Sequence, residues 1–267
     1  MKTFLIIDGH GIAHKAYHAV NAHLTAPDGT PTAAIVGFMN MLYHVQDELR
    51  PDCTIIVFDA SGSTSGVHAF RYDLQPDYKS NRKPTPEDLK IQLPILQKLL
   101  EALGFRVIIR EGVEADDVAA SIAKLAEAHG HNAVVLSSDK DLFQILGPRI
   151  KMMRPLRQGV SRAEIYDTRK FMNEYGFPPA SMADYLALFG DKIDNIKGVR
   201  GIGDLTAKKL LAVYPTIEAV FSALDDLPKA VRTKLQAAGM DSILWCRDNM
   251  IRLRDNIFDD DAGFLDE

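Results

Sequence analysis

Short apolar runs alternate with amphipathic segments over the first half of the chain. The runs have the length and continuity of buried parallel strands and span residues 3–7, 54–58, 105–109 and 133–137. The amphipathic segments repeat apolar residues every three or four positions, which predicts helices, and span residues 31–49, 89–103 and 114–125. From residue 168 to about residue 254 the pattern is helical. We therefore expect an α/β core over residues 1–167 and a helical region over residues 168–267.

Other residues refine these boundaries. Pro31 suits a helix start, Pro94 predicts a kink, and Gly104 suits a helix end. Residues 61–66 are a run of Ser, Gly and Thr typical of a loop. We expect the acids at residues 259–261 and 266–267 to form a frayed, solvated tail.

Two basic segments show no regular period. Residues 70–87 mix tyrosines and prolines with Arg71, Lys79, Arg82 and Lys83. Residues 149–162 are also basic, and we expect them to be irregular. Either segment can be a solvated loop, but basic residues interleaved with aromatic ones also suit contact with single-stranded nucleic acid.

Acidic residues follow three predicted strands and begin one predicted helix. They are Asp8, Asp59, Glu114, Asp116, Asp117, Asp139 and Asp141. Acids at a helix start also stabilise the helix as caps, so Glu114, Asp116 and Asp117 alone would not indicate a metal site. Because the carboxyl ends of parallel strands share one edge of a sheet, we expect the acids to gather there. Such carboxylates repel one another unless a cation joins them, and their hard oxygens favour Mg²⁺ or Mn²⁺.

Asp8 also suggests a second class of enzyme, which His10 argues against. A phosphatase of the haloacid dehalogenase type begins with such an Asp but needs a second acid where His10 stands.

The composition narrows the protein class. With 267 residues, of which 46% are hydrophobic, the chain can bury a full core. A net charge of −5 does not exclude a polyanionic partner, because the acids are concentrated at one predicted site. Cys53 and Cys246 lie in no zinc spacing and form no disulfide framework. Since no stretch resembles a signal peptide or a membrane span, we expect a cytoplasmic protein without a membrane partner.

A glycine-rich stretch from Gly198 to Leu210 follows a second acidic loop, which contains Asp191 and Asp194. A dinucleotide-binding loop is excluded, because no apolar strand precedes it and Thr206 replaces the third Gly or Ala of that fingerprint. The pattern indicates a helix-hairpin-helix over about residues 185–213, in which backbone N–H groups hold a phosphate. Such a hairpin contacts the DNA backbone and does not read its sequence.

Six short motifs, spread over nearly the whole chain, follow one another in a characteristic order. They are Leu5 to Gly9, Val57 to Asp59, Tyr78-Lys79 with Arg82, Glu114 to Asp117, Ser138 to Leu142, and Gly190 to Ile196 leading into the hairpin. Together they closely resemble the 5′-nuclease domain of bacterial DNA polymerase I and the flap endonucleases. The resemblance implies a PIN-like, flap-endonuclease-like α/β fold with a mostly parallel central sheet. It also implies a helical arch at about residues 70–90 and a C-terminal helix-hairpin-helix (H2TH) motif.

The resemblance implies a divalent-metal-dependent 5′-3′ exonuclease and flap endonuclease that acts in replication and repair. Two or more Mg²⁺ or Mn²⁺ ions would be held by Asp8, Asp59, Glu114, Asp116, Asp117, Asp139, Asp141, Asp191 and Asp194. The catalytic residues would be Lys79, Arg82, Asp116 and Asp139. DNA contacts would come from His14, Lys15, Tyr78, Lys79, Arg82, Lys83, Gly198, Val199, Gly201, Ile202, Gly203, Thr206, Lys208 and Lys209.

The implied partners are a 5′ flap or a nicked or branched duplex with a free 5′ end, an RNA–DNA primer, and a potassium ion at the hairpin. The protein would act as a monomer. It departs from the family in four places: His14 replaces Tyr, Lys15 replaces Arg, and Lys197 and Arg200 replace Pro. Two alternatives remain open, a non-catalytic DNA-binding protein of the same fold and a PIN-like ribonuclease.

Overall fold

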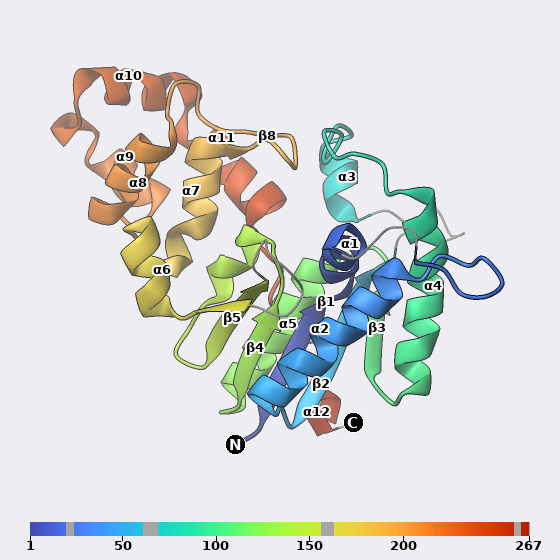
Figure 1. Ribbon diagram of the computed structural model, residues 1–267. Coiled ribbons are helices and arrows are strands. Elements are labelled where there is room, and N and C mark those ends of the chain that lie inside the picture. The colour runs from blue at the N-terminus through green and yellow to red at the C-terminus, as the bar shows by residue number, and fades with distance from the viewer. Residues whose placement is uncertain (20–23, 61–68, 156–162, 259–262, 267) are drawn as a thin grey trace.

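A six-stranded sheet forms the centre of the protein (Figure 1). The computed structural model describes residues 1–19, 24–60, 69–155, 163–258 and 263–266. The strand order is β3-β2-β1-β4-β5-β6, and only β6 is antiparallel to its neighbour. The strands are β1 (Thr3–Asp8), β2 (Cys53–Asp59), β3 (Arg106–Arg110), β4 (Asn132–Leu136), β5 (Ile150–Pro155) and β6 (Ala163–Tyr166). The four predicted strands and the mostly parallel sheet are thus confirmed.

The expectation of an irregular segment at residues 149–162 is wrong for its first part, which forms β5. Ile150, Met152 and Met153 are buried, whereas Lys151 is exposed. The basic residues obscured the apolar pattern of this short strand, whose apolar side chains enter the core. Residues 156–162, with Arg157 and Arg162, lie outside the described residues.

Alternate side chains of the strands enter two separate cores. Leu5 and Ile7 pack with three helices on one face, α1 (Gly9–Ala19), α2 (Ala33–Leu49) and α4 (Glu87–Ala102). Phe4 and Ile6 face α5 (Ala115–Ala128), η1 (Lys140–Ile145) and the C-terminal helices. Burial of both faces explains why the strands are continuously apolar.

The predicted helices are confirmed with small shifts at their ends. The helix expected from residue 31 begins at Ala33, because Pro31 pairs with Thr25 in an isolated β-bridge. Pro94 lies inside α4, and Gly104 follows the end of that helix with a φ of +83°. That left-handed conformation suits glycine.

The chain crosses the sheet in a way that creates a switch point. It adds β2 and β3 on one side of β1 and then returns to place β4 and β5 on the other side. Ligands of open α/β sheets bind beyond the carboxyl ends of the strands at such a point. Asp8 at the end of β1 and the residues that follow β4 lie on either side of it.

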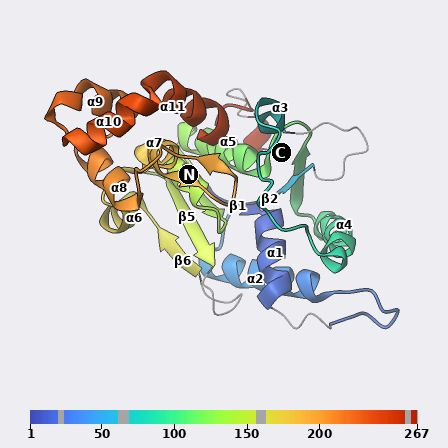
Figure 2. The same cartoon turned by 90° about the horizontal axis from the view of Figure 1, so that it is seen from above.

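The second half of the chain is mostly helical. Its helices between residues 168 and 246 lie beside the β5–β6 end of the sheet, whereas its last helix, residues 263–266, lies near β3 (Figures 1 and 2). Its elements are α6 (Thr168–Tyr175), η2 (Pro179–Ser181), α7 (Met182–Phe189), α8 (Asp204–Val213), α9 (Ile217–Ser222), η3 (Leu224–Asp226), α10 (Lys229–Ala238), α11 (Met240–Cys246), the π-helical turn η4 (Arg247–Ile251) and α12 (Gly263–Asp266). Phe143 of η1 packs against Phe171 of α6 with ring centroids 5.2 Å apart, which joins the two halves. Within the described chain, no helix combines the length and apolar character that a membrane span requires.

The expectation of purely helical structure after residue 168 is wrong at one place. The two-residue strands β7 (Gly190–Asp191) and β8 (Ile196–Lys197) pair in antiparallel fashion between α7 and α8. The acidic loop folds back on itself through this pairing. The expected tail is only partly visible: residues 259–262 and 267 lie outside the described residues, and Phe264 of α12 packs on Phe258.

The hairpin predicted between two helices is present between α7 and α8. Gly198 lies so close to α7 that an added Cβ would be 2.3 Å from the backbone carbon of Phe189. Gly201 has a φ of +83°, and Gly203 precedes α8 with open space around it. Of these three glycines, Gly198 is therefore the one that close packing against backbone requires.

We predict that Gly198→Ala lowers the free energy of unfolding by about 1–3 kcal/mol, because the new methyl group meets backbone that cannot move aside. The matched control is Gly203→Ser, which places a favoured N-cap residue in open space. Urea unfolding of both variants checks this. Equal stability of the two variants would contradict the close packing.

Candidate metal centre

Three of the predicted acids lie at the carboxyl edge of the sheet. Asp8 and Asp59 end β1 and β2, and Asp139 caps η1 after β4. Asp8 accepts hydrogen bonds from the Gly11 N–H at 2.8 Å and from the Ser137 hydroxyl at 2.7 Å. Burial, together with repulsion from Asp59 and Asp116, raises the pKa of Asp8 to about 6 despite these bonds.

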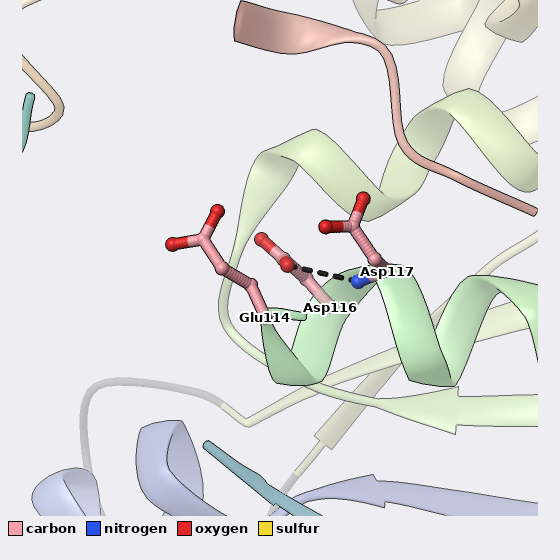
Figure 3. Close-up of side chains that lie close together, drawn as sticks. All are labelled: Glu114, Asp116 and Asp117. Atoms are coloured by element: carbon pink, nitrogen blue, oxygen red, sulfur yellow. Dashed lines mark hydrogen bonds between the residues drawn. The ribbon is translucent and has the colours of Figure 1, made fainter. Parts of the chain in front are cut away.

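Glu114, Asp116 and Asp117 form the first cluster, at the start of α5. Figure 3 shows their side chains leaving the helix start side by side, with Asp116 in the middle of the view. Each contributes an oxygen to a group whose members lie within 4.8 Å of one another. Asp116 accepts a 2.8 Å hydrogen bond from the Asp117 N–H (Figure 3).

A buried arginine neutralises this first cluster. Arg71 of α3 (Phe70–Leu74) is 1% exposed. Its guanidinium donates to Glu114 at 2.7 Å and to the two oxygens of Asp117 at 2.6 and 2.9 Å. It also donates to the backbone carbonyls of Met250 and Arg252 at 3.0 and 3.1 Å. The expectation that Arg71 belongs to an exposed basic segment is therefore wrong, because five acceptors hold it inside the protein.

The contacts distinguish the roles of the three acids. Both oxygens of Asp117 accept from Arg71, and one also accepts from the Arg254 N–H at 2.8 Å. Asp117 therefore fits the role of a buried counter-ion better than that of a metal ligand. Glu114 accepts from Arg71, from Lys79 and from the Tyr78 hydroxyl. Burial and the neighbouring Asp116 nevertheless raise the pKa of Glu114 to about 7.

Asp141, Asp191 and Asp194 form the second cluster, and all three are buried. Lys140 donates to Asp191 at 2.6 Å, and Arg82 donates to one oxygen of Asp194 at 2.5 and 2.9 Å. Sequence reasoning missed Lys140, although its position between two predicted ligands was a usable signal. Burial raises the pKa of Asp139 to about 6, and repulsion from Asp116 and Asp194 adds to it, so Asp139 senses both clusters.

The two clusters fit divalent cations. Among the described residues, Asp141 Oδ1 is the buried side-chain atom for which no hydrogen-bond partner exists. Burial and repulsion from Asp139 raise the pKa of Asp141 well above its usual value. A metal ion would supply the missing partner and remove the repulsion, and a set of carboxylate oxygens suits Mg²⁺ or Mn²⁺.

The basic and aromatic residues predicted to contact DNA occupy different environments. Lys79 is ion-paired to Glu114, and although burial opposes its charge, Asp116 and Glu114 raise its pKa. Lys15 donates to the Pro155 carbonyl, whereas Lys83 is exposed. His14 is half-buried beside His18, and burial lowers its pKa.

Tyr78 is a correction to the predicted DNA contacts. It is 4% exposed and belongs to the core, where its ring packs edge-on against Tyr72. Its ring is therefore not available to stack on a base. Its hydroxyl donates to Glu114 at 3.2 Å, so the residue supports the acidic cluster.

The hairpin divides its predicted DNA-binding residues between the surface and the core. Val199 and Ile202 are buried, whereas Gly201 and Gly203 are exposed, so the hairpin can offer backbone and not apolar side chains. Lys209 is exposed. Lys208 lies 3.0 Å from Asp204 and 5.3 Å from the Tyr175 ring, contacts that offset part of its charge. Thr206 is partly exposed on the first turn of α8, and Gly198 lies against α7.

Comparison with known proteins finds two matching family descriptions. The 5′-3′ exonuclease N-terminal resolvase-like domain matches residues 3–176, and the 5′-3′ exonuclease C-terminal SAM fold matches residues 177–258. A 5′-3′ exonuclease of Aquifex aeolicus is 32% identical over 88% of this chain and 79% of its own length. The thermostable DNA polymerase I of Thermus aquaticus is 40% identical over 87% of this chain. The chain spans only 26% of that polymerase.

Solved structures share the fold. T5 5′-exonuclease with bound divalent metal ions (zinc) aligns with a TM-score of 0.69 and 20% identity, over 93% of each chain. The catalytic core of Rad2 in complex with a DNA substrate aligns with a TM-score of 0.54 and 17% identity, over 97% of this chain and 75% of the other. At these identities the likeness establishes the architecture alone.

We predict that Arg71→Met lowers the free energy of unfolding by about 3–5 kcal/mol, because it leaves the Asp117 carboxylate buried without a counter-ion. Adding Asp117→Asn should restore part of the loss. Urea unfolding measures both effects. The control is Arg232→Met, which breaks an ion pair whose partner Asp225 is exposed and should change stability little. A loss in Arg71→Met no greater than in the control would show that the pair contributes little.

The raised carboxyl pKa values predict a pH dependence without divalent metal. Since Asp139 has a folded pKa of about 6, the folded protein binds more protons than the unfolded chain between about pH 4 and 6. The contribution of the Asp139 carboxyl to the free energy of unfolding therefore falls as the pH rises through this window. Asp139→Asn should be more stable than the wild type by about 1–2 kcal/mol near pH 7.5, and the gain should shrink towards pH 5.

Thermal and urea unfolding in chelator, at a series of pH values, test this difference. Asp225→Asn, an exposed carboxylate, serves as the control and should follow the wild type at each pH. A gain for Asp139→Asn that grows towards pH 5 would mean that the pKa is lowered in the folded protein.

Proposed function

The chain belongs to the 5′-3′ exonuclease family, and from this we propose that it is a structure-specific, divalent-metal-dependent 5′-nuclease. It would hydrolyse phosphodiester bonds of DNA at 5′ ends and 5′ flaps, as an exonuclease and a flap endonuclease. One observation carries the proposal: Lys79 and Arg82, three residues apart, each contact one of the two carboxylate clusters. Asp139 is repelled by Asp116 of the first cluster and by Asp194 of the second, so the clusters are neighbours.

The acids have distinct proposed roles. Glu114, Asp116 and Asp139 would hold a metal at the first cluster, and Asp141, Asp191 and Asp194 a second metal. Asp8 and Asp59 lie at the adjoining strand ends and would complete the shell. Asp117 would keep Arg71, and through it Glu114, in place. When bound, paired divalent ions generate a hydroxide nucleophile and stabilise the leaving oxygen of an in-line displacement.

Lys79 and Arg82 would bind the scissile phosphate. Lys79 is ion-paired to a carboxylate of the first cluster and Arg82 to one of the second. Each could therefore reach a phosphate held between the clusters. The planar guanidinium of Arg82 gives directional contacts to phosphate oxygens, whereas Lys79 supplies a point charge. The first cleavage products would carry a 5′-phosphate and a 3′-hydroxyl.

The hairpin would bind the duplex beside the cut. The exposed backbone at Gly201 and Gly203 leads into the N-terminus of α8, where N–H groups suit a phosphate. Lys197 and Arg200, which replace the prolines usual in the family, are exposed and add positive charge. We also propose K⁺ at the hairpin carbonyls. In support, the Lys234 ammonium lies 2.8 Å from the Gly201 carbonyl oxygen, so this turn accommodates a cation.

Several finer points complete the proposal. Mg²⁺ or Mn²⁺ would be the catalytic ion, an RNA–DNA primer would be a second substrate, and the protein would act as a cytoplasmic monomer. Two thiols that form no disulfide, Cys53 and Cys246, support a reducing compartment. The α/β core would end near residue 167, where the helical DNA-binding region begins with α6.

Cleavage of a 5′-labelled flap on a duplex, in Mg²⁺ and in chelator, tests the function. Asp139→Asn and Asp141→Asn should each lower the single-turnover rate by about 100-fold or more, because each removes a ligand charge from the metal site. Asp225→Asn, an exposed carboxylate outside both clusters, is the matched control and should cut at the wild-type rate.

The outcomes separate the alternatives. Metal-dependent products that end near the junction support the nuclease. Tight flap binding without any product would favour the non-catalytic reading, and cutting of structured RNA with no cutting of the flap would favour a ribonuclease.

A further inference from the structure

Two loops that lie far apart in the sequence interlock beside the metal centre. One comprises residues 75–82, which carry Lys79 and Arg82, and the other comprises residues 191–195, which carry Asp191 and Asp194. Their backbones join where the Lys79 N–H donates to the Asp194 carbonyl at 3.0 Å. Side chains add further bonds in both directions, so the loops form one unit.

Asn195 supplies most of these side-chain bonds. Its amide nitrogen lies 2.9 Å from the Asp77 carbonyl, 2.9 Å from an Asp77 carboxylate oxygen and 3.2 Å from the Ser80 hydroxyl. Its amide oxygen accepts from the Asn81 side chain at 3.2 Å. Its backbone carbonyl accepts from Gln75 at 3.2 Å. Every polar group of its side chain is thus directed at the other loop.

The backbone conformation is unusual at both ends of this contact. Asn195 and Lys79 have φ values of 58° and 55°, and both lie in the left-handed region. Asn tolerates this conformation because its side chain can form local hydrogen bonds, whereas Lys adopts it rarely. Surrounding contacts must therefore hold Lys79 in place, and the bond from its N–H to Asp194 is one of them.

The same unit is continuous with the hairpin. Asn195 is followed directly by β8, which pairs with β7, and β8 leads into Gly198. The hairpin is therefore connected to residues 77–81 through β8 and the side-chain bonds of Asn195. Arg82 follows this turn and contacts Asp194 on the other loop.

We propose that Asn195 is a positioning residue that links the hairpin to residues 75–82, so that duplex binding at the hairpin sets Lys79 and Arg82 over the metal centre. This rests on the duplex-binding and phosphate-binding roles proposed above. The link explains how a hairpin that does not touch the scissile phosphate can make cutting depend on the presence of a duplex.

The test compares three variants and one control variant with the wild type. Asn195→Gly keeps a backbone that favours positive φ but removes every side-chain bond. Asn195→Asp keeps the shape and places a carboxylate against that of Asp77. Adding Asp77→Asn to Asn195→Asp exchanges donor and acceptor in the side-chain bond and should rescue part of the link, because the backbone carbonyl of residue 77 still lacks its donor. Ser80→Ala, which removes one 3.2 Å contact, is the mild control.

Three measurements are needed: the single-turnover rate of flap cleavage, the Kd for the flap with Ca²⁺ in place of Mg²⁺, and amide hydrogen exchange of residues 76–82. We expect Asn195→Gly to slow cleavage by about 10-fold or more, because the two cations are misplaced. Its Kd should stay within about 2-fold of the wild-type value, because the hairpin still binds the duplex. The amides should lose their protection, and duplex should no longer increase it.

Wild-type cleavage and wild-type exchange in Asn195→Gly would overturn the link, as would a failure of Asp77→Asn to restore any rate to Asn195→Asp. A loss of rate that comes entirely from a weaker Kd would also overturn it. If the wild-type protein neither binds nor cuts the flap, the proposed function fails. Exchange in the free proteins then decides the link by itself: lost protection in Asn195→Gly supports it, and unchanged protection overturns it.

Discussion

Repulsion between carboxylates is the constraint on which the rest of the structure depends. The fold gathers acids from β1, β2, α5, η1 and the β7–β8 loop at one edge of the sheet, and burial makes their charge costly. The pKa values of Asp8, Asp139 and Glu114 rise in response. Buried charge of this density needs cations, and the protein supplies Arg71, Lys79, Arg82 and Lys140 to its two clusters.

Three of these four cations come from one short insertion between β2 and α4. Arg71 is fully enclosed and acts within the protein, whereas Arg82 stays partly exposed beside Asp194. The insertion thus combines a permanent counter-ion with residues suited to meet a phosphate. Its place is set by bonds to two distant parts of the chain, the carbonyls of Met250 and Arg252 at the end of η4 and the loop around Asn195. Hydrogen bonds therefore join this segment to both carboxylate clusters and to the loop that leads into the hairpin.

Most of the fold could be predicted from the sequence, and the site only in part. Strands such as Thr3–Asp8 are buried on both faces, so a continuous apolar run marks them unambiguously. By contrast, β5 was hidden by its basic residues, and β7 and β8 are too short to show any period. The acids at the strand ends could be found because parallel strands bring their carboxyl ends to one edge. The burial of Arg71 and Tyr78 could not, because neither the five-residue helix that carries Arg71 nor the turn that carries Tyr78 shows an amphipathic period.

The sequence by itself determined the α/β architecture, the order of the acidic motifs and the hairpin between two helices, because each of these follows from local periodicity and residue spacing. The tertiary structure alone decided which cation meets which carboxylate. Arg71 and Asp117, or Asn195 and Asp77, are separated by many residues and meet only when the chain has packed. Pairings of this kind depend on distance and on exclusion of water, and neither quantity can be read from residue order.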